Sequence, residues 1–264
     1  MGGGGDFATE GAVTSYISEV YSQIWDEMIL SNNLNLSCFV VSSMLSPDLN
    51  HVYNNPTLEH IAISDKNSQT KIVNSRESAG VSDIGIHYLS NKLADSLSSP
   101  DKIDPPRLHF LDDTRLPSIP RFKKIALGGT FDRLHNGHKK LLTLATFIAT
   151  EMIIIGITGD EMLKGKSNSN LIAQVHERSA LVTQFMGSFI GRDPAYSIVE
   201  ITDPYGPTIT DESIQAILVS SETIAGALKI NEIRKDKGFP ALDIIISRRS
   251  NVATLSSTFL RKNN

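Results

Sequence analysis

After residue 121, short apolar runs rich in β-branched residues alternate with longer amphipathic stretches. The apolar runs predict strands at Lys124–Leu127, Met152–Ile157, Tyr196–Ile201, Ala216–Val219 and Ile244–Ile246. The stretches between them predict helices near Gly137–Ala149, Val175–Ile190 and Thr223–Lys237. This alternation indicates an α/β protein with a doubly wound, five-stranded parallel sheet. Ligands of such sheets bind beyond the carboxyl ends of the strands, where the strand order reverses, so functional residues are expected just after strands.

The first 120 residues follow a different pattern. Apolar residues recur there at three- and four-residue spacing, which predicts one face of a helix. That face comprises Val13, Ile17, Val20, Ile24 and Met28. Cys38–Val41 is a candidate buried strand, and the polar stretch Ser98–Pro120 carries five prolines, which is typical of a linker. We therefore predict an N-terminal α/β extension of unknown role over residues 1–120, linker included, and a second domain over residues 121–264.

The composition narrows the class of protein. Hydrophobic residues make up 40% and charged residues 20% of the 264 residues, as in a soluble globular chain. The net charge of -4 gives no overall attraction to nucleic acid or to an anionic membrane. The single cysteine, Cys38, cannot form an intrachain disulfide and indicates a reducing compartment, so we expect a cytoplasmic protein. Apolar runs such as Met152–Ile157 are too short to cross a bilayer, and Met1–Asp6 lacks the pattern of a secretory signal.

The segment Gly128–His138, GGTFDRLHNGH, follows the first strand of the predicted sheet and opens a helix. Its two glycines let the main chain approach a ligand closely, and the free amides of a helix N-terminus favour phosphate. His135 and His138 are three residues apart, so both imidazoles can face one anion if the helix begins near Asn136. Two such donors could stabilise the charge that develops in phosphoryl transfer. A zinc site is the alternative, but no third ligand stands nearby, so we predict no protein-bound metal.

In its longer form, GGTFDRLHNGHKKLL, this segment resembles the HxGH signature of the nucleotidyltransferase superfamily, which includes class I aminoacyl-tRNA synthetases. It is most similar to phosphopantetheine adenylyltransferases of the eukaryotic and archaeal type, and the resemblance covers about residues 122–262. Three further segments fit in order: DPYGP at Asp203–Pro207, VSxET at Val219–Thr223, and ISSTxxR at Leu255–Arg261, where leucine replaces isoleucine. The resemblance implies a Rossmann-like nucleotidyltransferase fold. Bacterial members carry an arginine-rich segment in place of VSxET, so their arginine roles cannot be transferred.

The resemblance implies that the chain transfers the adenylyl group of ATP to 4'-phosphopantetheine, giving dephospho-CoA and pyrophosphate in coenzyme A biosynthesis. The implied catalytic residues are His135, His138, Lys164 and Lys166. The implied acceptor-binding residues are Thr130, Lys164 and Arg178. By its position in a predicted helix alone, Arg178 is more simply interpreted as a surface charge, and which lysine contacts the acceptor stays open. The implied nucleotide-binding residues are Gly128, Gly129, Thr130, Phe131, Ser220, Glu222, Thr223, Asn231, Ser256, Ser257, Thr258 and Arg261. The hydroxyl residues among them are equally good helix caps.

Two other functions remain open. A cytidylyltransferase of the same superfamily would share the HxGH turn, but such enzymes carry RTxGIST where this chain has Asn251–Thr258. A regulatory protein would bind nucleotide without turnover. The expected cofactor is Mg²⁺ bound with ATP. No GxxxxGK[ST] segment follows the transferase part, so we expect a separate dephospho-CoA kinase and other enzymes of the coenzyme A pathway as partners.

Overall fold

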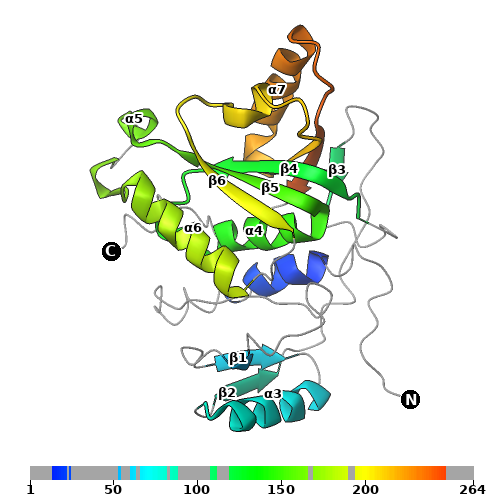
Figure 1. Ribbon diagram of the computed structural model, residues 1–264, viewed down its shortest axis with the longest axis vertical. Helices are drawn as coiled ribbons and strands as arrows, with labels where there is room; N and C mark the ends of the chain where they lie inside the picture. Colours follow the sequence, from blue (N-terminus) through cyan, green and yellow to red (C-terminus); the bar gives the residue numbers. More distant parts are fainter. Residues whose placement is uncertain are drawn as a thin grey trace. The chain divides into compact units, whose positions relative to one another are not determined.

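The computed structural model describes residues 14–22, 24, 53–54, 60–63, 66–81, 84–88, 108–111, 119–165, 169–189 and 194–247. The chain divides into two compact units, both drawn in Figure 1. The first unit comprises Met1–Ala8 and Ser42–Ile103, and the second comprises Thr9–Val41 and Asp104–Asn264.

The first unit contains a strand–helix–strand element. Strand β1 (His60–Ile63) pairs in parallel with β2 (Gly85–Tyr88), and helix α3 (Lys66–Ala79) connects them. Arg76 of α3 is buried, and its Nη1 donates a hydrogen bond of 2.6 Å to the carbonyl of Tyr53. The α/β character predicted for the N-terminal extension is therefore present in this unit.

A six-stranded parallel sheet forms the centre of the second unit. Its strands are β3 (Leu108–Phe110), β4 (Phe122–Gly129), β5 (Ala149–Thr158), β6 (Ala195–Ile201), β7 (Ala216–Ser220) and β8 (Asp243–Ser247). They lie in the order β3-β8-β7-β4-β5-β6, and every neighbouring pair is parallel. The chain thus runs outward from β4 to β6 and then returns to β7 on the other side of β4. This reversal makes the sheet doubly wound, as predicted.

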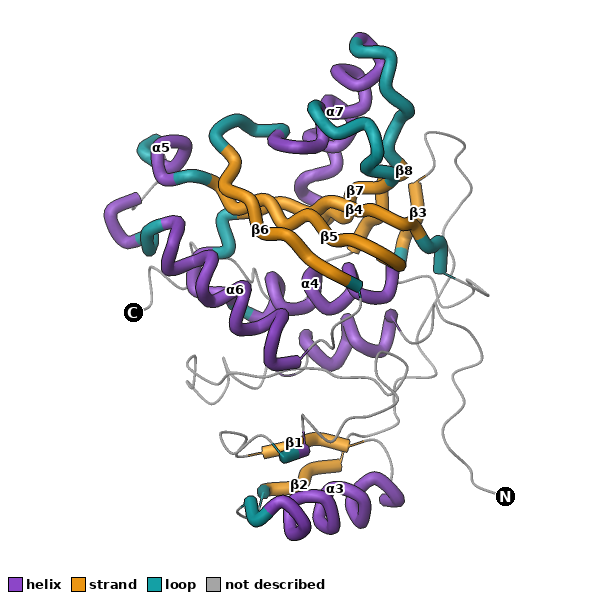
Figure 2. Tube along the Cα trace, in the orientation of Figure 1, coloured by secondary structure: helices purple, strands orange, loops and turns teal. Residues whose placement is uncertain are grey.

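Helices cover both faces of this sheet (Figures 1 and 2). Helices α4 (Asn136–Ile148) and α6 (Val175–Phe189) lie on one face, and α7 (Ile224–Asp236) lies on the other. Short elements complete the connections: α5 (Asp160–Leu163) and the 3-10 turns η2 (Asp132–Leu134), η3 (Ser169–Leu171), η4 (Gly206–Ile209) and η5 (Ser221–Thr223). The three predicted helices are confirmed to within a residue or two at either end.

The predicted number of strands needs a correction. All five predicted strands are present, but β3 adds a sixth at the edge beside β8. It comes from the proline-bearing stretch that the sequence suggested was a linker. Three residues carry too little periodicity to be recognised as a strand. Removal of everything before residue 119 would take this edge strand out of the sheet.

The predicted amino-terminal helix also belongs to the second unit. Residues 14–22 are helical, and Ile17 and Val20 of the predicted apolar face are buried. The hydroxyl of Thr14 donates to the carbonyl of Leu111 at 2.6 Å. The hydroxyls of Tyr21 and Thr143, the latter on α4, lie 3.2 Å apart. This helix therefore contacts the element that carries the two histidines. Val13, Met28 and the candidate strand Cys38–Val41 lie outside the described residues.

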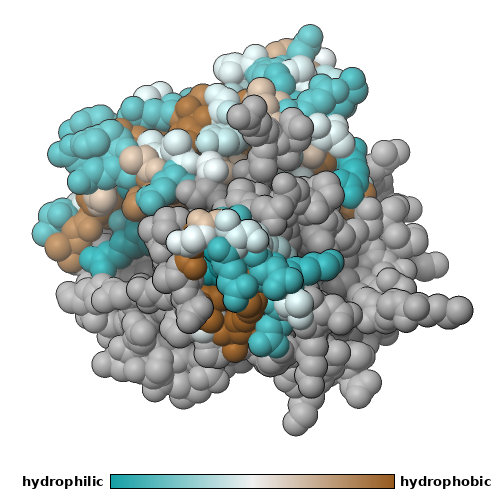
Figure 3. Space-filling model, turned by 60° about the horizontal axis from the view of Figure 1, so that its bottom comes forward, coloured by the Kyte–Doolittle hydropathy of each residue, from teal (hydrophilic) through white to brown (hydrophobic). Residues whose placement is uncertain are grey.

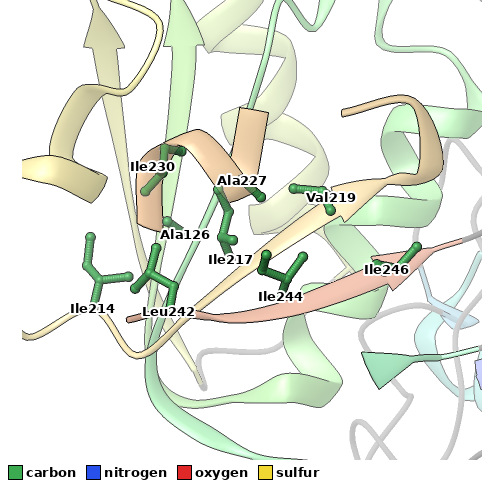
Figure 4. Close-up of a cluster of buried hydrophobic side chains, with 9 residues drawn as sticks. All are labelled: Ala126, Ile214, Ile217, Val219, Ala227, Ile230, Leu242, Ile244 and Ile246. Carbon is green, nitrogen blue, oxygen red and sulfur yellow. The ribbon is translucent and has the colours of Figure 1, made fainter. Parts of the chain in front are cut away.

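The β-branched composition of the strands explains where the core lies. Ile153, Ile155 and Ile157 of β5, an interior strand between β4 and β6, are completely buried. On the other side, α7 closes over β7 and β8, and the apolar side chains of all three elements meet there (Figure 4). This cluster comprises Ala126, Ile214, Ile217, Val219, Ala227, Ile230, Leu242, Ile244 and Ile246. Each fully buried isoleucine contributes about 1.5–3 kcal/mol by leaving water.

Exposed apolar side chains do not concentrate on any one element. The large ones are Val73 of α3, Leu171 of η3, Leu181 of α6 and Leu228 of α7. On the face drawn in Figure 3, hydrophobic residues form small groups among hydrophilic ones. Within the described ranges, no helix has both the length and the apolar character needed to span a membrane.

Candidate active site

The strand order reverses between β4 and β7, so the expected ligand position lies beyond the carboxyl ends of these two strands. Strand β4 ends in Gly128 and Gly129, and β7 ends in Ser220. Two of the predicted nucleotide-binding segments, the glycine turn and Ser220–Thr223, therefore follow neighbouring strands at one edge of the sheet. Their separation along the chain is about ninety residues, and only the sheet brings them together.

The turn that follows β4 has a strained main chain. Phe131, Arg133 and Leu134 have φ angles of 52°, 56° and 28°, which side chains other than glycine rarely adopt. They are the non-glycine residues with positive φ in the described part of the chain. Residues in such conformations cost of order 1–3 kcal/mol each and cluster at functional sites. The burial of Phe131 and Leu134 holds this conformation in place.

The two histidines stand at the start of α4. His135 is the residue before the helix, and its carbonyl accepts hydrogen bonds from the amides of His138 (2.8 Å) and Lys139 (3.1 Å). The helix begins at Asn136, as the sequence analysis required. The imidazole rings are stacked, with centroids 3.8 Å apart and planes inclined by 22°. The turn therefore presents two imidazoles side by side at the positive end of a helix dipole.

His138 is held in its neutral form. Burial lowers the pKa of His138 well below its ordinary value, and the neighbouring His135 lowers it further. The ring of Phe131 packs against it, with centroids 5.1 Å apart. His138 Nδ1 is buried and has no hydrogen-bond partner among the described residues. An anion that bound beside His138 would counteract this lowering of its pKa, because a nearby negative charge favours the protonated imidazole.

The glycine pair leaves room above the turn. A Cβ atom at Gly128 would lie 3.7 Å from the carbonyl oxygen of Gly156, and one at Gly129 would lie 3.4 Å from the Phe131 ring. Both are ordinary contacts, so the described part of the fold tolerates a methyl group at either position. Gly159 differs, because a Cβ there would lie 3.1 Å from the main-chain carbonyl oxygen of Ile201, as well as 2.7 Å from Glu200 Oε1. The packing thus explains Gly159, whereas Gly128 and Gly129 fit a close approach by something outside the chain.

Arg178 lies on α6 beneath this edge, and its side chain is completely buried. The alternative that it is a surface charge is therefore wrong. Its Nη1 donates to the carbonyl of Thr130 at 2.7 Å, and its Nη2 donates to the carbonyl of Thr158 at 2.8 Å and to Asp160 Oδ1 at 2.7 Å. Its Nε donates to Ala173 at 2.8 Å. Helix periodicity could not distinguish this arginine from an exposed one, because its partners come from distant segments.

Asp160 is the residue that the sequence analysis did not single out. It begins α5 directly after β5, and its Oδ2 accepts a hydrogen bond of 3.2 Å from the amide of Val175, at the start of α6. Desolvation raises its pKa, but the hydrogen bonds from Val175 and Arg178 and the charge of Arg178 outweigh that effect and lower the pKa overall. An acidic residue at a helix start immediately after a buried strand is the signal that could have found it.

The remaining predicted residues that the structure describes are Lys164, three residues of the turn into α7, and Asn231. Lys164 is exposed and pairs with Glu161. Ser220 and Thr223 lie close together at the turn into α7, with hydroxyls 3.2 Å apart, and Glu222 and Thr223 are exposed.

Asn231 differs from the expectation. Its amide nitrogen donates to the carbonyl of Leu242 at 2.9 Å, and its amide oxygen accepts from the amide of Leu242 at 2.8 Å. Leu242 precedes β8, so Asn231 joins α7 to the amino end of that strand rather than to the edge where ligand is expected. Lys166, Ser256, Ser257, Thr258 and Arg261 lie outside the described residues.

Comparison with known proteins finds a matching family and, among the relatives, proteins that carry nucleotidyltransferase names. The profile of the cytidylyltransferase-like family matches residues 126–263. The phosphopantetheine adenylyltransferase of Methanopyrus kandleri is 38% identical over 48% of this chain and 80% of its own length. The enzyme of the same name from Saccharomyces cerevisiae is 40% identical over 47% of this chain and 40% of its own. An uncharacterised protein of Schizosaccharomyces pombe is 44% identical over 45% of this chain and 37% of its own. The matches thus span about two fifths of the two fungal relatives.

Proposed function

Because this chain belongs to the cytidylyltransferase-like family, we propose that it transfers the adenylyl group of ATP to 4'-phosphopantetheine, giving dephospho-CoA and pyrophosphate. One observation carries the proposal: two stacked imidazoles stand at the N-terminus of α4, beside the switch point of a doubly wound sheet. Similarity to archaeal and yeast phosphopantetheine adenylyltransferases supports the choice of nucleotide and acceptor.

The chemistry makes modest demands on the protein. An oxygen of the acceptor's 4'-phosphate attacks the α-phosphorus of ATP, a new phosphorus–oxygen bond forms, and the bond to the β-phosphate oxygen breaks. Pyrophosphate leaves with the electron pair. The nucleophile is already an anion, so no side-chain base is required, and positioning together with charge stabilisation supplies the rate.

The residues of the turn after β4 would provide both the positioning and the charge stabilisation. His135 and His138 lie where they can donate to the phosphate chain while charge develops on the leaving oxygens. Gly128, Gly129 and Thr130 let the main chain come close to the substrates. Lys164 is exposed on the segment after β5, where its ammonium group could reach the acceptor phosphate. Burial and the neighbouring His135 lower the pKa of His138, and a bound anion would act in the opposite direction by favouring the protonated ring.

Magnesium would enter with ATP. This hard cation prefers oxygen ligands, which the triphosphate and water supply, and there it would neutralise phosphate charge. The described residues contain no group of three His, Cys, Asp or Glu side chains that could hold an ion.

A panel of substrates tests the proposal. The purified chain is incubated with ATP or CTP and with phosphopantetheine or a phosphorylated alcohol as acceptor, and pyrophosphate is measured. We expect pyrophosphate release only in the reaction that contains both ATP and phosphopantetheine. Release with CTP and a phosphorylated alcohol would instead favour the cytidylyltransferase alternative. Tight ATP binding without turnover would favour the regulatory one.

The same panel bears on partners and location. We propose that the product leaves for a separate dephospho-CoA kinase in the cytoplasm, within reach of other enzymes of coenzyme A synthesis. Detection of coenzyme A in a reaction that contains only this chain, ATP and phosphopantetheine would contradict a separate kinase.

A further inference from the structure

The buried arginine of α6 touches the ends of two strands at once. Arg178 donates to the carbonyl of Thr130, directly after β4, and to the carbonyl of Thr158, the last residue of β5. The first carbonyl belongs to the turn that carries the histidines. The second precedes the segment that carries Lys164. A single guanidinium therefore joins the segments assigned to the nucleotide and to the acceptor.

The Arg178 guanidinium also contacts residues at both ends of the connection between β5 and α6. Asp160 accepts from Arg178 with one carboxylate oxygen and from the amide of Val175 with the other, at 2.7 and 3.2 Å. Arg178 Nε donates to the carbonyl of Ala173 at 2.8 Å. Both ends of the connection that contains Lys164 are thus tied to one side chain. The arginine itself is completely buried, so it acts through these partners.

We propose that Arg178 is a positioning residue, which with Asp160 fixes the acceptor-binding segment relative to the histidine turn. This inference rests on the proposed function, because it concerns the alignment of the two substrates. In-line attack needs the reacting atoms about 3–3.5 Å apart, and a misplacement of about 1 Å can cost about 100-fold in rate. Either substrate alone can still bind when the two segments shift relative to each other.

Arg178→Lys is the direct test. Lysine keeps the charge beside Asp160 but offers one nitrogen, which cannot serve Thr130, Thr158 and Ala173 together. We expect kcat, expressed per ATP-binding site titrated by calorimetry, to fall about 10- to 100-fold. We expect the Kd for ATP to change less than about threefold. A role confined to stability would lower the number of ATP-binding sites and leave kcat per site unchanged.

Arg234→Lys is the matched control. Arg234 is as completely buried as Arg178 but lies on α7, with partners before β7 and β8 at the opposite edge of the sheet. We expect it to lower the unfolding temperature without changing kcat per site. An equal loss of kcat per site in both variants would overturn the proposal, because it would reflect general loosening of the sheet.

Asp160→Asn serves if Arg178→Lys fails to fold. It keeps the shape of the side chain, and we expect a smaller fall in kcat per site, about threefold to tenfold, in the same direction. Unchanged kcat per site in a folded Arg178→Lys, or in Asp160→Asn where it alone folds, would overturn the proposal.

A readout independent of turnover completes the test. Hydrogen exchange should accelerate together at residues 128–134 and 160–165 in Arg178→Lys, and at residues 206–214 in Arg234→Lys. If only one of the first two segments changes in Arg178→Lys, the coupling between them is refuted. A wild-type chain that makes no dephospho-CoA contradicts the proposed function, whereas an active wild type with an unaffected Arg178→Lys contradicts this inference alone.

Discussion

A buried arginine lies at each end of the parallel strands, and the two have different hydrogen-bond partners. We call the side where the strands begin the amino edge and the side where they end the carboxyl edge. At the amino edge, Arg234 has five N–H groups and donates to five carbonyls, those of Thr208, Asp211, Glu212, Ile214 and Pro240, at 2.6–3.2 Å. At the carboxyl edge, Arg178 makes three bonds to carbonyls and a fourth to a carboxylate. The amino edge thus uses every donor to hold loops in place.

The main chain around the two arginines differs in the same way. Near Arg234, the left-handed position falls on a glycine, Gly238, which adopts positive φ at little cost. Near Arg178, the left-handed positions fall on Phe131, Arg133 and Leu134. One edge is relaxed, whereas the other stores strain, and His138 Nδ1 there is buried with no hydrogen-bond partner among the described residues. Because strained residues cluster at functional sites, we interpret this contrast as support for placing the candidate site at the carboxyl edge.

The largest expected effect is on catalysis at the carboxyl edge. His138→Ala should lower pyrophosphate release by at least about 100-fold, because loss of one donor to the transition state costs about 2.7–4 kcal/mol. The variant should still fold, since His138 Nδ1 has no hydrogen-bond partner among the described residues whose loss would destabilise the protein. His176→Ala, at an exposed position on α6, is the control. Near-normal turnover in folded His138→Ala would abolish the distinction between the edges.

The next effect is on stability at the amino edge. Arg234→Met should lower the free energy of unfolding by at least about 3 kcal/mol, because five carbonyls lose a partner and each unsatisfied buried group costs about 1–3 kcal/mol. Urea unfolding measures it. The kcat per ATP-binding site of the folded fraction should stay within twofold of wild type. A specific loss of kcat would show that this edge also takes part in catalysis.

The pH dependence of stability sharpens the comparison. His138 has a lowered pKa in the folded protein, so below about pH 6.5 the unfolded chain binds a proton that the folded chain does not. Stability is then lost as the pH falls from about 6.5 toward the folded pKa. The urea midpoint should drop between pH 7.5 and 5.5, and by less in His138→Gln.

Carboxylates do not obscure this comparison. Asp160 and Asp211 have lowered pKa values, so their contributions are fully present above their ordinary value of 3.8 and are lost only as the pH falls below it. His176→Gln is again the control, and it should retain the wild-type dependence. A drop of equal size in His138→Gln would mean that the stacked pair is not the source.

The smallest expected effects are changes in stability, caused by removing main-chain strain at one edge and introducing it at the other. Arg133→Gly should stabilise the fold by up to about 1 kcal/mol, because glycine adopts a left-handed conformation without the steric cost. Gly238→Ala should destabilise it by about 1 kcal/mol, since no atom lies within 4 Å of the added Cβ and only the φ of 73° opposes it. Thermal unfolding measures both, and two changes of the same sign would contradict the assignment of strain to the histidine turn.

The sequence predicted the regular elements well because each carries a long periodic signal. The helices that begin at Asn136, Val175 and Ile224 follow strands of β-branched residues, and the first of them has a clear apolar face. Strand β3 was missed because three residues carry no recognisable period. Its place in the sheet depends on pairing with β8, more than a hundred residues later.

Within the candidate site, too, the features formed by one local segment were predictable and those formed by distant segments were not. The glycine turn and the histidine pair form one local segment, so motif and spacing were enough to find them. Asp160 and the burial of Arg178 were not visible, because a guanidinium's partners come from segments that only the fold brings together. Asn231 was misplaced for the same reason, since its partner Leu242 lies across a loop.

By itself, the sequence determined the parallel α/β architecture, the position of the histidine turn after a strand and, to within a residue, the start of α4. These follow from local periodicity and from backbone preferences that act over a few residues. Only the tertiary structure decided that the two imidazoles stack, that the turn is strained and that Arg178 ties both strand ends together. Such features depend on contacts between distant segments, whose geometry packing fixes and which no short stretch of sequence specifies.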